Sequence, residues 1–66
     1  MENGRREKFL KVYSNLPIVA RKDIVLVLEK DGVKQPVTWE VAYGEILNEL
    51  PNANHMLDIL EKLGII

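Results

Sequence analysis

The chain of 66 residues has no cysteine and a single histidine, His55. Without cysteine there is no disulfide framework and no thiolate metal site, and the composition is compatible with a reducing cytoplasm. A domain of this size buries roughly 60% of the surface that its unfolded chain exposes. Small domains often gain stability from disulfides, a metal ion or a partner subunit. We therefore expect one small domain over residues 1–66, and we favour an oligomer.

Long apolar runs are also missing from the sequence. The longest uninterrupted apolar run covers residues 24–28, whereas a membrane-spanning helix needs about 20 apolar residues. The same stretch is too short for the core of a signal peptide. We expect a soluble, cytoplasmic protein with no membrane contact, no metal and no cofactor.

Catalytic side chains are scarce. Ser14, Thr38 and His55 are the only residues of their kinds, and there is no glycine-rich phosphate loop. Nucleophilic catalysis needs a nucleophile, a base and an orienting group in one cleft. The acidic residues of the second half are explained by the solvated faces of helices; these are Glu40, Glu45, Glu49 and Glu61. The sequence therefore predicts a protein that is not an enzyme.

An Asp-Gly pair between two apolar runs is the strongest structural signal in the chain. Asp31 and Gly32 fit the two central positions of a type I′ turn, which pairs Lys30 with Val33. The pairs that follow are Glu29 with Lys34, Leu28 with Gln35, Val27 with Pro36, and Leu26 with Val37. This register places one apolar set toward the core, namely Ile24, Leu26, Leu28, Val33 and Val37, and leaves Val25 and Val27 on the open face.

Apolar residues at helical spacing predict three helices, over residues 5–14, 39–49 and 53–63. The buried stripes are Phe9, Val12, Tyr13 and Leu16; then Trp39, Ala42, Tyr43, Ile46, Leu47 and Leu50; then Met56, Ile59, Leu60 and Leu63. The expected N-caps are Asn3, Thr38 and Asn52, and Asn15 is expected to end the first helix in the left-handed conformation. Residues 17–23 form a connector with room for one helical turn. Gly44, inside the second predicted helix, indicates either the close approach of another backbone or sequence drift without a structural role.

These elements give an α+β domain in the order α-β-β-α-α, with an antiparallel hairpin packed on one face by helices. A two-stranded sheet is marginal in water, and the outer edge of residues 24–28 carries no proline and no inward charge. We expect a neighbouring strand to pair there, from another protein or from a second copy in a homodimer. The candidate interface consists of Ile24, Val25, Leu26, Val27 and Leu28.

Nucleic-acid binding is the alternative function. Residues 1–34 carry eight Lys/Arg and five Asp/Glu, whereas residues 35–66 carry one and five. The second and third predicted helices are joined by a short turn that fits a helix-turn-helix, and residues 59–66 resemble the helix end of many winged-helix domains. Asp58 and Glu61 give the last helix the wrong sign for phosphate. The contacts would fall instead to Arg5, Arg6, Lys8, Lys11, Arg21 and Lys22.

Overall fold

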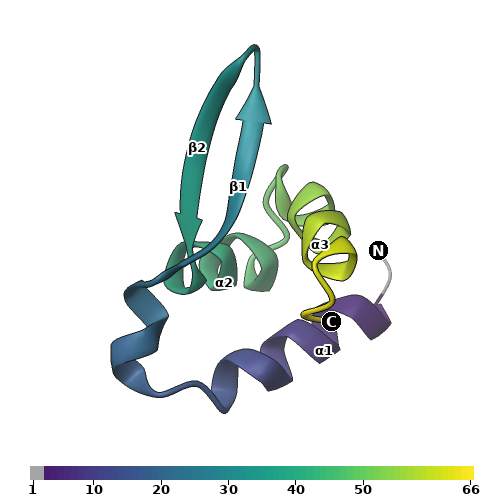
Figure 1. The fold of residues 1–66 in the computed structure, drawn as a ribbon. Helices are drawn as coiled ribbons and strands as arrows, with labels where there is room; N and C mark the ends of the chain where they lie inside the picture. Colours follow the sequence, from purple (N-terminus) through teal and green to yellow (C-terminus); the bar gives the residue numbers. More distant parts are fainter. Residues whose placement is uncertain (1–2) are drawn as a thin grey trace.

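The computed structural model describes residues 3–66 and confirms the predicted α+β class and element order. The elements are α1 (Asn3–Ser14), η1 (Ile18–Lys22), β1 (Ile24–Lys30), β2 (Val33–Thr38), α2 (Trp39–Leu47) and α3 (Ala53–Lys62). The short 3-10 helix η1 is the helical turn expected in the connector. Figure 1 shows the hairpin rising from α2, with α1 and α3 beside α2 and the tip of the hairpin extending beyond the helices.

The hairpin has the predicted register from its turn to Leu26. Asp31 and Gly32 have φ values of 54° and 78°, as the two central residues of a type I′ turn require. All five predicted pairs, from Lys30 with Val33 to Leu26 with Val37, are confirmed. The Asp-Gly turn therefore sets which side chains reach the core.

A shift in register at the open end of the hairpin corrects the prediction for Ile24 and Val25. A regular ladder would pair Ile24 with Trp39, but Ile24 pairs with Thr38, which leaves Val25 as the extra residue of a β-bulge. Ile24 is 59% exposed, whereas Val25 is half-buried and packs against the core. The bulge has exchanged the faces of these two residues.

Val33 is a second correction, with a different cause. It lies on the predicted face but is 65% exposed. Val33 is the first residue of β2, next to the turn, and Figure 1 shows this tip of the hairpin standing away from the helices.

Helix α2 begins where the hairpin ends. Thr38 is its N-cap, as predicted, because its hydroxyl oxygen accepts a hydrogen bond of 3.2 Å from the Val41 N–H. The N–H of Trp39 donates to the Asp23 carbonyl over 3.1 Å, which joins the start of α2 to the residue before β1. A Cβ built on Gly44 meets no atom within 4 Å, so no described backbone approaches it closely.

Helices α2 and α3 end in the same motif. In each, the residue after the C-cap has a positive φ, 52° at Glu49 and 79° at Gly64. The next amide reaches back five residues, from Leu50 to the Glu45 carbonyl and from Ile65 to the Leu60 carbonyl, both over 3.0 Å. Both ends are Schellman motifs. At the end of α2, Glu49 occupies the left-handed position that glycine normally takes.

One expected cap is in place without its side-chain bond, one is wrong, and a third is not described. Asn52 occupies the N-cap position of α3, as predicted, and its carbonyl accepts from the Met56 N–H over 2.9 Å, but its φ of −87° and ψ of −2° are helical and its side chain makes no cap hydrogen bond. Asn15 is not among the residues with positive φ; its side-chain amide donates to the Lys11 carbonyl over 3.1 Å. The structure does not describe the side chain of Asn3.

The core lies between the three helices and the inner face of the hairpin. Its buried members are Phe9, Tyr13, Leu26, Leu28, Val37, Ala42, Ile46, Ala53, Met56, Leu57 and Leu60. The stripe of α3 differs from the prediction: Leu57 is fully buried and Leu63 is 57% exposed. The stripe starts at Ala53 and includes Leu57, because α3 turns this side toward α2 and β1. In α2 and its C-terminal turn, Leu47 and Leu50 are exposed, against expectation.

Candidate functional site

The outer edge of β1 has no strand partner among residues 3–66, where the sheet consists of β1 and β2 alone. Pairs next to a two-residue turn exchange hydrogen bonds, and every second pair does so along the ladder. The register therefore directs the N–H and C=O groups of Lys30 and Leu28 toward β2, and those of Glu29 and Val27 outward. Within the described part of the chain, neither outward N–H donates to backbone beyond the hairpin. An unpaired edge of this kind can serve as a template for another strand.

The five residues of the predicted interface divide into two groups. Leu26 and Leu28 are buried in the core, and Val25 is half-buried, so these three offer mainly backbone at the edge. Ile24 and Val27 are 59% and 47% exposed. The side chains available to a partner are thus Ile24 and Val27.

The bulge gathers apolar side chains on the outer face of the hairpin. Ile24 pairs with Thr38 and Val27 pairs with Pro36, so the four residues lie on the same face of the hairpin, opposite Leu26 and Val37. Sequence reasoning missed Ile24 as a member of this face, since no local residue pattern signals the bulge. The outer face and the free edge of β1 meet at Val27.

Three of the six predicted nucleic-acid contacts have partners within the chain. Arg5 binds Asp58 and Glu61 on α3, and the hydrogen bond from Arg5 holds the pKa of the Asp58 carboxyl below its ordinary value. Arg6 donates from Nη2 to the Leu47 carbonyl at the end of α2 over 3.1 Å. Both arginines therefore fasten α1 to the other helices.

Arg21 is the third basic residue with a partner in the chain, and its partner is an aromatic ring. The guanidinium carbon of Arg21 lies 4.6 Å from the centroid of the Tyr13 ring. Lys8, Lys11 and Lys22 are exposed and form no ion pair with another described residue. The structure thus does not bring the six basic side chains together as one free cationic surface.

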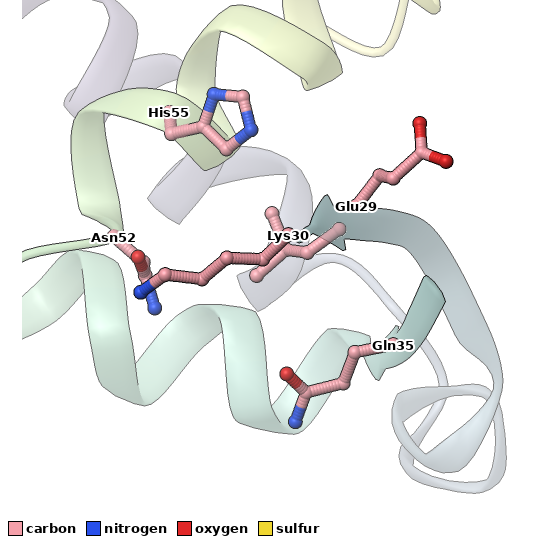
Figure 2. A pocket seen from close by; sticks show the side chains of 6 residues that line it. Glu29, Lys30, Gln35, Asn52 and His55 are labelled. Carbon is pink, nitrogen blue, oxygen red and sulfur yellow. The ribbon is translucent and has the colours of Figure 1, made fainter. Parts of the chain in front are cut away.

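A small cleft lies between the hairpin and the start of α3 (Figure 2). Its volume is about 280 Å³, and it is lined by Leu28, Glu29, Lys30, Gln35, Asn52 and His55. Lys30 extends toward Asn52, whereas the Glu29 carboxylate points away from the cleft (Figure 2). The other polar side chains of the lining carry an amine, two amides and an imidazole, which offer hydrogen bonds to a ligand.

Residues 3–66 contain no group of three or more His, Cys, Asp or Glu side chains arranged to hold a metal ion. In the same part of the chain, every helix is too short or too polar to cross a membrane.

The chain was compared with protein-family models, with curated proteins and with solved structures, and none of the three comparisons gave a match.

Proposed function

We propose that this protein is a non-enzymatic interaction module that forms a homodimer by antiparallel pairing of two β1 strands. The observation that carries the proposal is the unpaired outer edge of β1, beside exposed Ile24 and Val27. An exposed edge is a template for another strand, and pairing would extend a marginal two-stranded sheet to four strands. The lack of cysteine suits a reducing compartment, and we place the dimer in the cytoplasm.

The outward backbone groups limit the register of such a dimer. A two-fold axis at Val27 lets the N–H and C=O of Val27 bond those of Val27 in the second copy, and it sets Leu26 beside Leu28 of the second copy. The register centred on Val27 is therefore the one we propose.

Light scattering over a concentration series tests the dimer, with one substitution made at two exposed valines. Val27→Lys should give a monomer, because the two-fold axis brings the two lysines together. Val41→Lys is the matched control: Val41 is 54% exposed on α2, away from the edge, so this variant should remain dimeric. Far-UV circular dichroism establishes that both variants are folded.

Val27→Pro provides a second test of the same edge. Proline removes the outward N–H of Val27 but no hydrogen bond of the hairpin, and it should also give a monomer. A wild-type protein that is monomeric at every concentration, or a Val27→Lys protein that remains dimeric, would refute the proposal.

Nucleic-acid binding remains the competing proposal and has less support, since Arg5 and Arg6 hold groups of their own chain. Retention on DNA or RNA that weakens steeply with salt would favour it. Failure to bind at low salt would remove it.

A further inference from the structure

A second cavity lies where α1, η1 and α2 meet, on elements separate from the edge of β1. Its volume is about 400 Å³, within the usual range of ligand pockets, and it is lined by Tyr13, Ile18, Arg21, Lys22, Glu40 and Tyr43. The lining combines two aromatic rings, two cations, one carboxylate and one exposed apolar side chain.

The two tyrosines form a stacked wall of this cavity. The centroids of the Tyr13 and Tyr43 rings are 4.2 Å apart, with 12° between their planes. Arg21 lies against Tyr13, with its guanidinium carbon 4.6 Å from the ring centroid. Stacking on a ring restrains a guanidinium and leaves the N–H groups along its edge available to an acceptor.

Arg21 lacks a polar partner in the described part of the chain. Its Nε is buried and makes no hydrogen bond, and neither of its terminal nitrogens forms an ion pair or a hydrogen bond with residues 3–66. Glu40 lines the same cavity but does not pair with Arg21 or Lys22. The terminal N–H groups are therefore available to a bound oxyanion, which would form charge-assisted hydrogen bonds with them.

We propose that this cavity binds a small organic anion that carries one carboxylate or phosphate on an aromatic body. Arg21 supplies a two-pronged contact to the oxyanion, and Lys22 adds charge. Tyr43 and Ile18 contact the body of the ligand, while the buried Tyr13 ring supports Arg21. Glu40 opposes a second negative group, which favours a single oxyanion over a polyphosphate. The site is independent of the proposed dimer, because Val27 and the edge of β1 take no part in it.

Amide NMR titrations with benzoate and phenyl phosphate test the site, and their relative affinities distinguish carboxylate from phosphate. We expect saturable shifts at Tyr13, Arg21 and Tyr43, weaker binding of inorganic phosphate, which lacks the body, and weaker binding of phenol, which lacks the oxyanion. Arg21→Lys keeps the charge but loses the fork, so affinity should fall tenfold or more.

Lys34→Gln removes a cation on the hairpin and should leave the affinity unchanged. Amide dispersion of each variant verifies its fold. The proposal fails if neither anion gives saturable shifts, if Arg21→Lys binds as tightly as the wild type, or if phenol binds as tightly as benzoate.

Discussion

Helices α2 and α3 end in the same backbone motif, once with glutamate and once with glycine in the left-handed position. Glu49 has φ 52° and Gly64 has φ 79°. In this conformation a Cβ crowds a carbonyl oxygen, at roughly 1–2 kcal/mol for residues other than glycine. We predict that Glu49→Gly stabilises the protein and that Gly64→Ala destabilises it.

The expected size of each effect follows from the two positions. At Glu49 the release of this backbone strain is partly offset by the extra conformational freedom that glycine gives the unfolded chain, roughly 0.5–1 kcal/mol. Removing a negative charge from a helix C-terminus adds about 0.3 kcal/mol, so the net gain is about 1 kcal/mol. At Gly64 an added Cβ meets no described atom within 4 Å, so the loss is purely conformational. It should also amount to about 1 kcal/mol.

Urea and thermal unfolding followed by circular dichroism measure both changes. A change of 1 kcal/mol shifts Tm by roughly 4–8 °C in a domain of this size. All variants are compared at one protein concentration, since association would itself raise the apparent stability. If Glu49→Gly lowers the free energy of unfolding, or if Gly64→Ala leaves it unchanged, the strain assigned to the left-handed position is wrong.

Three further predictions concern α2 and α3. Gly44→Ala should raise the free energy of unfolding by about 1 kcal/mol in the same urea experiment, because Gly44 is inside a helix and has space for a Cβ. Thr38→Ala should lower the free energy of unfolding by about 1 kcal/mol, because the cap hydrogen bond from the Val41 N–H is lost. Thr38→Ser keeps a hydroxyl at the N-cap and should retain most of that stability. Arg5→Gln should raise the pKa of Asp58, measured by carboxyl carbon NMR. Since that pKa is lowered by folding, its contribution to stability is complete above about pH 4 and is lost as the pH falls through the folded pKa.

The hairpin was largely predictable because its information is local. The Asp31-Gly32 turn sets the register outward from the tip, and every pair as far as Leu26 with Val37 follows from it. The bulge at Val25 lies at the opposite end, where the chain must leave η1 and also reach the start of α2. That requirement is tertiary, so no residue pattern announces the exchange of Ile24 and Val25.

The candidate sites were predictable only in part, for a related reason. The backbone edge of β1 follows from strand order and can be inferred from sequence. The stack of Arg21, Tyr13 and Tyr43 joins three elements that are distant along the chain, and the sequence showed each residue only as part of a stripe or a charge count. Likewise, a count of basic residues does not reveal that Arg5 is held by Asp58.

The hydrogen bond from the Trp39 N–H to the Asp23 carbonyl joins the base of the hairpin to the first residue of α2. The amides of the first helical turn have no acceptor within their own helix, so Asp23 supplies one from outside it. A slip of one residue would turn Leu26 and Leu28 out of the core and would also remove this acceptor from the helix. The base of the hairpin and α2 should therefore open together as one cooperative unit, while the tip frays alone. In amide hydrogen exchange, Trp39 should be protected nearly to the limit of global unfolding, and Val33 should exchange much faster.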